Sequence, residues 1–190
     1  MNKENKMIRS VLVMMIFSGL TNVMADESVI TKYGKELDGI ISKHIQDNPN
    51  FKPAIDATVV ISIMAGASML NPNYKEPVPK NKRADNYGRG LCALTVTGAK
   101  NNIGDKITEK HLADPSVHLE ICFLWLDTLA KKTNINLLTP KTLPTEELKH
   151  RLTQMEELAT AFFGRNQRDK IARTQTAYLF TLMVYRLATY

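Results

Sequence analysis

The sequence contains only two cysteines, Cys92 and Cys122, among its 190 residues. They are too far apart for the Cys-x-x-Cys arrangement of redox catalysts. Neither lies near residue 25, where a bacterial lipid anchor would need one. In an oxidising compartment an isolated pair most simply forms a disulfide. We therefore predict a Cys92–Cys122 disulfide, with two buried free thiols as the alternative.

The common catalytic signatures are also missing. There is no Gly-x-Ser-x-Gly motif and no Gly-rich phosphate loop, since the glycines of residues 86–90 lie in too short a segment. Zinc sites commonly place histidines three or four positions apart on one helix. His111 and His118 are seven positions apart across an expected helix start, and His44 and His150 lie on polar faces. We therefore expect four surface histidines, no catalytic residue, no metal and no cofactor.

Two carboxylates keep an enzyme open as an alternative. Asp56 and Glu120 both lie in apolar stretches that we expect to be helical. Burial could raise the pKa of such a group, which is typical of a general acid. The simpler interpretation is that each side chain points to solvent or finds a hydrogen-bond partner.

The N-terminus has the three parts of a secretory signal peptide. Lys3, Lys6 and Arg9 precede an apolar stretch over residues 11–20, and Val23-Met24-Ala25 forms a small-x-small cleavage pattern. The apolar part is about half the roughly 20 residues that span a bilayer. We therefore predict removal of residues 1–25 and a periplasmic or secreted location. An uncleaved anchor or a buried N-terminal helix is the alternative.

The net charge that remains after processing is small. The 25 Lys and Arg and 19 Asp and Glu residues give a net charge of +6, which falls to +4 once the three basic residues and one acid of residues 1–25 are removed. This mild excess permits an anionic partner without requiring one. Residues 26–190 are sufficient for one domain with a sizeable core.

No long segment alternates apolar and polar residues, which disfavours strands. Apolar residues instead recur every three or four positions, so the sequence predicts an all-α, single-domain bundle of five or six helices with one disulfide. Asp114-Pro115 is a typical helix start, an Asp cap followed by Pro at the first helical position. We expect helices, in chain order, over residues 28–46, 54–70, 85–100, 114–132, 145–163 and from 166 onward, with a short additional helix over 105–112 as an option.

The helix expected over residues 54–70 is apolar on nearly every side, which indicates a buried central helix. The run Val59–Ile63 has strand propensity, which is the main competing interpretation. A membrane span would have to accommodate Asp56 and a short length, so we expect no transmembrane anchor in the mature chain. The small residues 65–68 would let a neighbouring helix approach closely.

Residues 71–86 form the longest segment without helical or strand character. Prolines 72, 77 and 79 exclude a regular interior. Loops this long in a compact domain are usually functional or disordered. Basic and aromatic side chains concentrate here and just beyond, and we predict that they form a binding surface: Tyr74, Lys75, Lys80, Lys82, Arg83, Tyr87 and Arg89. A solvated connector is the alternative.

These features favour a non-enzymatic, exported binding or structural subunit, such as an accessory component of a cell-envelope complex or secretion machine. The expected partner is a protein with an acidic surface, with an anionic envelope component as the alternative. Nucleic acid is not expected in that compartment. An immunity or inhibitor protein that binds a secreted toxin or enzyme is the alternative, and a small enzyme with an unrecognised site is the third.

Overall fold

The computed structural model describes residues 27–138, 145–163, 172–174, 176–177 and 179–181. Within these ranges the chain is helical with three isolated β-bridges and no strand, which confirms the all-α prediction. The predicted signal peptide and its cleavage site lie outside the described residues. The elements are α2 (Glu27–Asp47), α3 (Ala57–Ser68), the 3₁₀ helix η1 (Ala84–Asn86), α4 (Val96–Asn102), α5 (Glu109–Ala113), α6 (Pro115–Lys132) and α7 (Thr145–Phe163).

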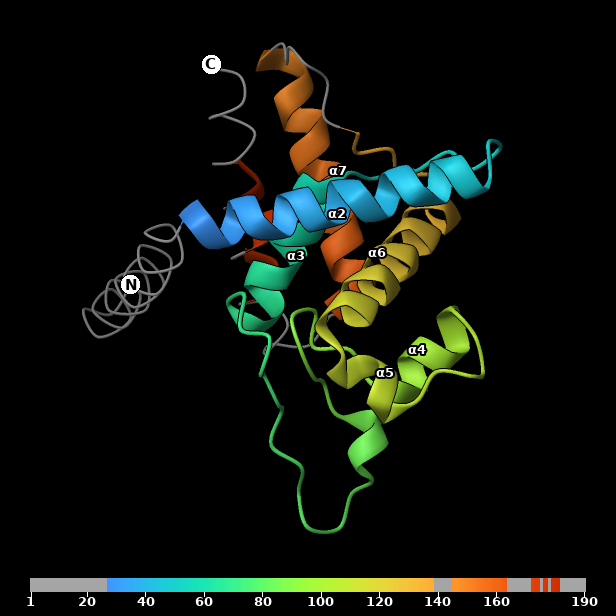
Figure 1. The fold of residues 1–190 in the computed structure, drawn as a ribbon. Helices are drawn as coiled ribbons and strands as arrows, with labels where there is room; N and C mark the ends of the chain where they lie inside the picture. The colour runs from blue at the N-terminus through green and yellow to red at the C-terminus, as the bar shows by residue number, and fades with distance from the viewer. Residues whose placement is uncertain (1–26, 139–144, 164–171, 175, 178, 182–190) are drawn as a thin grey trace, which may run out of the picture.

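Helix α3 is the centre of the core. Residues Val59, Val60 and Ile63 are fully buried, so the helical interpretation is correct despite their strand propensity. Helices α2 and α6 both pack against α3, and Figure 1 shows α2 running across it. None of the described helices is long and apolar enough to cross a membrane.

The small residues of α3 permit close packing, as predicted. A Cβ atom on Gly66 would lie 2.6 Å from the Ala172 carbonyl oxygen and 2.1 Å from the Thr176 hydroxyl oxygen. Ala172 and Thr176 belong to the helical residues described near the C-terminus. The beginning of the helix predicted from residue 166 lies outside the described residues.

The two caps show how local sequence determines where helices begin. The Asp114 carboxylate accepts hydrogen bonds from the Ser116 and Val117 N–H groups, and Pro115 opens α6 as predicted. Asp56 was expected inside a helix, and that expectation is wrong. Its carboxylate caps α3 by accepting a bond of 3.2 Å from the Val59 N–H. A short acidic side chain competes for backbone donors and therefore belongs at a helix start.

The predicted helix over residues 85–100 does not exist. The chain instead forms η1, a turn over residues 87–94, and then α4 from Val96. Gly90 has φ +65° and Ala93 has φ +48°, both in the left-handed region. A right-handed helix cannot contain such residues, so the predicted helix is interrupted at Gly90 and Ala93.

A buried carboxylate that the sequence did not reveal joins α6 to the segment before α3. Asp127 is only 2% exposed. Its Oδ1 atom accepts from the Ala54 N–H at 2.6 Å, and its Oδ2 atom accepts from Lys131 Nζ at 2.6 Å. The Ala54 carbonyl in turn accepts from the Leu137 N–H. Both carboxylate oxygens are therefore used in fixing the fold.

Candidate interaction surface

The loop over residues 71–86 projects from the helical body. It leaves the end of α3, runs away from the helices and returns through η1 (Figure 1). Residues 77–83, which we call the tip, are all exposed. The tip contains Lys80, Lys82 and Arg83 and an apolar side chain, Val78, that is 42% exposed. Basic and apolar groups are thus presented together on one protrusion.

Backbone pairing closes the base of this loop. The Gly90 N–H donates to the Tyr74 carbonyl at 2.8 Å, and the Glu76 N–H donates to the Gly88 carbonyl at 2.9 Å. The Gly88 N–H donates to Glu76 Oε2 at 3.0 Å. A narrow ladder therefore holds the outgoing and returning segments side by side, with an antiparallel bridge between Lys75 and Arg89.

A tight turn follows the ladder. Arg89 and Leu94 exchange two backbone hydrogen bonds of 3.0 Å. Neighbouring atoms leave no room for a side chain at Gly88 or Gly90. A Cβ atom on Gly88, for example, would lie 2.5 Å from the Ala93 carbonyl oxygen. Cys92 lies in this turn and not in a helix, which corrects the predicted position of that residue.

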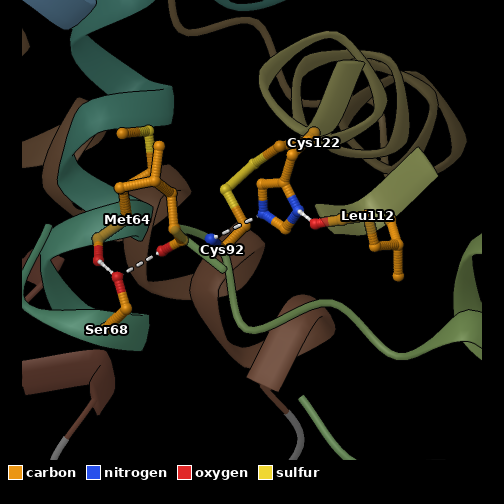
Figure 2. The surroundings of a disulfide bond; sticks show 7 residues. Met64, Ser68, Cys92, Leu112 and Cys122 are labelled. Atoms are coloured by element: carbon orange, nitrogen blue, oxygen red, sulfur yellow. Dashed lines mark hydrogen bonds between the residues drawn. A yellow bond between two sulfur atoms is a disulfide. The ribbon is translucent and has the colours of Figure 1, made fainter. Parts of the chain in front are cut away.

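The disulfide fastens the turn to α6. Cys92 and Cys122 are bonded, with Cα atoms 6.2 Å apart, which confirms the predicted pairing (Figure 2). Both cysteines are fully buried. The Ser68 hydroxyl at the end of α3 donates to the Leu91 carbonyl at 2.6 Å, next to the disulfide in the chain. The turn is therefore tied to two core helices.

His118 adds a third attachment and is not the surface residue that the sequence suggested. It is 2% exposed. Its Nε2 atom accepts from the Cys92 N–H at 3.2 Å, which makes Nδ1 the donor to the Leu112 carbonyl at 3.2 Å. Burial lowers the pKa of His118 to about 4, against a smaller opposing effect of the Leu112 hydrogen bond. The neutral ring thus links α6, α5 and the turn.

The seven predicted binding residues divide into two groups. Lys75, Lys80, Lys82 and Arg83 are exposed, whereas Tyr74, Tyr87 and Arg89 are partly buried at the base. Arg89 forms an ion pair with Glu109, and its side chain is 17% exposed. Arg83 contacts Asp85 at 3.3 Å but remains 83% exposed. The structure therefore separates an exposed basic tip from a base in which Tyr74 and Tyr87 are partly buried and Arg89 is paired with Glu109.

The other ionisable groups that the sequence singled out have structural partners. His44 was expected to be solvated, but its Nε2 atom lies 2.9 Å from Glu120 Oε1 and its ring packs near Phe51 and Phe123. Glu120 thus has a hydrogen-bond partner, as the simpler interpretation anticipated. His111 Nδ1 accepts from the Thr108 N–H at 3.1 Å at the start of α5. Across the described residues, no three His, Cys, Asp or Glu side chains are grouped to hold a metal ion.

A shallow hollow of about 250 Å³ lies between α2 and the start of α6. Its lining is mixed: Glu36, Ile40, Lys43, Ser116, Val117, Leu119 and Glu120. His118 and Asp127, the buried ionisable groups described above, do not line it. The hollow therefore concentrates neither one sign of charge nor buried ionisable groups, whereas the loop concentrates basic side chains.

The chain matches no protein-family model, and comparison with curated proteins and with solved structures gave no match.

Proposed function

We propose that this chain is an exported, non-enzymatic binding subunit that recognises an acidic protein surface through the tip of the 71–86 loop. The observation that supports it is an exposed basic tip on a base fixed by a backbone ladder, a disulfide and a buried histidine. The proposed setting is a complex of the cell envelope, in which the chain is an accessory component.

A fixed base favours binding because it reduces the cost of ordering the loop. Association requires the immobilisation of mobile segments, and a loop already held in its bound shape loses less conformational entropy. Pro77 and Pro79 restrict the backbone of the tip further, since each fixes its own φ angle. The base therefore fixes where the loop emerges, and the two prolines limit the conformations that the tip can adopt.

The charges of the whole loop favour an acidic partner. Residues 71–84 contain four basic side chains and one acid, Glu76, whose carboxylate is engaged at the base. Among the described residues, no ion pair involves Lys75, Lys80 or Lys82. Such a patch attracts an oppositely charged surface and raises the rate of encounter. The neighbouring Val78 adds an exposed apolar side chain. Attraction between charges alone does not require such a side chain, so its presence favours a protein surface over a lipid head group as the partner.

Export is the second part of the proposal. The leader-like residues 1–25 support it, and so does the disulfide, because structural disulfides persist mainly in oxidising compartments. An inhibitor of a secreted toxin or enzyme is the alternative. The observation that favours an inhibitor is the shape of the loop, because a protruding loop with a fixed base can enter the active-site cleft of an enzyme.

Site-specific photo-crosslinking in the producing cell tests the proposal. A photoreactive residue at Val78 should capture a protein with an acidic surface, whereas the same residue at Ser42, on an exposed position of α2, should not. Charge reversal at Lys80, Lys82 and Arg83 should abolish the Val78 product. Equal crosslinking from Val78 and Ser42, or capture of lipid alone, would contradict the proposed protein contact.

A further inference from the structure

The tip contains few bonds that would prevent it from entering the cleft of another protein. Within the described residues, the backbone of positions 77–82 makes one backbone hydrogen bond, from the Lys82 N–H to the Pro79 carbonyl at 3.0 Å. The paired base begins only at Glu76 and Gly88. Residues 77–83 can therefore change their path without disturbing the core, which is the condition for limited proteolysis of a folded protein. From Ala84 onward the chain is held by the bonds of η1 and by the bond from the Thr97 hydroxyl to Asn86 Oδ1.

Arg83 has the features of a protease recognition residue within this segment. Its backbone is extended, with φ −76° and ψ 130°, and its side chain is 83% exposed. Extended substrates are bound by strand-like pairing in protease clefts. Its 3.3 Å contact with Asp85 is an exposed ion pair, a kind worth under about 1 kcal/mol. Its carbonyl accepts one long bond of 3.3 Å from the Asn86 N–H.

We propose that the Arg83–Ala84 bond is a processing site for a trypsin-like serine protease, the class whose specificity pocket holds a carboxylate for Lys or Arg. The reaction is a hydrolysis. Water adds its hydroxyl group to the Arg83 carbonyl carbon and a proton to the Ala84 nitrogen as the amide bond breaks. The products carry a new carboxylate at Arg83 and a new amino group at Ala84.

The two fragments should remain assembled after cleavage. The first contains α2 and α3, and the second contains both cysteines, so the disulfide does not join them. Buried contacts do, since α2 and α3 pack on α6. The Ala54 N–H also donates to Asp127, and the Ser68 hydroxyl to the Leu91 carbonyl. Cleavage would therefore open the tip without unfolding the molecule.

The consequence for binding depends on the proposed function, whereas the cleavage itself does not. An opened tip has lost the closure that restricts Lys80, Lys82 and Arg83, so the cleaved form should bind the acidic partner more weakly. Cleavage would then be an irreversible means of inactivating the binding surface.

Limited digestion of the purified, oxidised protein with a low ratio of trypsin, followed by intact mass measurement, tests the site. The expected first product is cut between Arg83 and Ala84, elutes as one species in gel filtration, and separates into two bands under denaturing conditions without reductant. The variant Arg83→Gln should lose the cut between residues 83 and 84, so that loop cleavage is left to Lys80 and Lys82 and is slower than in the wild type, with an unchanged melting temperature. The control Lys100→Gln, at an exposed position of α4, should be cut at the wild-type rate.

Three results would overturn the proposal. They are a first cut at a lysine on a helix, loop cleavage that Arg83→Gln does not slow, and dissociation of the fragments in native gel filtration. None of these measurements requires the binding partner, so failure here leaves the proposed function to its own test.

Discussion

At the residue scale, the most informative side chain is His118, a buried histidine whose two ring nitrogens both have partners. A buried polar group without a partner is costly, and these two hydrogen bonds offset that cost. The arrangement requires the neutral ring, because Nε2 must accept from the Cys92 N–H. Protonation would remove that acceptor and place a charge beside the disulfide.

This requirement predicts a pH dependence of stability. The pKa of His118 is about 4 in the folded protein, below its ordinary value of 6.5. The unfolded state therefore binds the proton more readily, so the contribution of this group is complete above pH 6.5 and decreases as the pH falls towards 4. Between pH 8 and pH 5 the free energy of unfolding should decrease by about 2 kcal/mol from this residue alone.

Denaturant unfolding at both pH values measures this effect. His118→Gln should be less stable than the wild type but lose about 2 kcal/mol less between pH 8 and pH 5. His150→Gln, at an exposed position of α7, should keep the wild-type dependence. Identical pH dependence in the wild type and His118→Gln would show that the ring is not buried in its neutral form.

The turn beside His118 predicts a contrast between two glycines. A Cβ on Gly90 would lie 2.6 Å from the His118 ring at a φ of +65°, whereas a Cβ on Gly39 in α2 meets nothing within 4 Å. Gly90→Ala should therefore cost about 2–4 kcal/mol through backbone strain and overpacking. Gly39→Ala should stabilise the protein by up to about 1 kcal/mol through helix propensity.

Thermal unfolding of the two variants is the appropriate measurement, because the substitutions are chemically identical. Opposite shifts of the melting temperature are expected. A Gly90→Ala variant as stable as the wild type would mean that the turn does not pack on the ring as described.

At the element scale, the loop base is the unit that the disulfide stabilises. Cross-linking positions 30 residues apart should contribute about 3–4 kcal/mol on the chain-entropy model. Cys92→Ser/Cys122→Ser should lose that amount and exchange the amide hydrogens of Gly88 and Gly90 faster, since the ladder loses its attachment to α6. The amides of Val60 and Ile63 in α3 should remain protected at temperatures well below the midpoint.

Mass spectrometry of the wild type under non-reducing conditions provides the control for that comparison. The intact mass should lie two hydrogens below that of the reduced chain. Two thiols that are readily alkylated in freshly purified protein would contradict the pairing.

The elements also show how far the sequence determines the fold. The stretches that became α2, α3, α6 and α7 could be predicted, because a long helix shows either an apolar face, as α2 and α7 do, or a continuous apolar run, as α3 does. The structure of residues 85–100 could not be predicted in this way. Their apolar spacing fits a helix, but Gly88 and Gly90 are required there by contacts with Ala93 and His118, which are tertiary and invisible in a local pattern.

The candidate surface was predictable in part for the same reason. The exposure of Lys80, Lys82 and Arg83 follows from a Pro-rich polar segment. The role of Arg89 does not, because its partner Glu109 lies on another element, α5. The burial of His118 was missed because its partners, the Cys92 N–H and the Leu112 carbonyl, are backbone groups that leave no mark in the sequence.

At the scale of the whole molecule, export can be tested apart from binding. N-terminal sequencing of the protein from the periplasmic or extracellular fraction should begin at Asp26, within a few residues. The basis is the charged start, the apolar stretch and Val23-Met24-Ala25. Recovery of cytoplasmic protein alone with Met1 intact would end this part of the account.

The central claim is that a basic tip on a fixed base binds an acidic protein. Its most direct test is the association rate with the partner captured at Val78, measured over a range of salt concentrations. Lys80→Glu/Lys82→Glu/Arg83→Glu should associate at least about tenfold more slowly at low salt and show a weaker salt dependence, with little change in stability. The control Lys35→Glu/Lys52→Glu/Lys106→Glu reverses three exposed lysines outside the loop and should associate almost as fast as the wild type. Equal association rates for the loop variant and the wild type would contradict the claim and leave the loop a solvated connector.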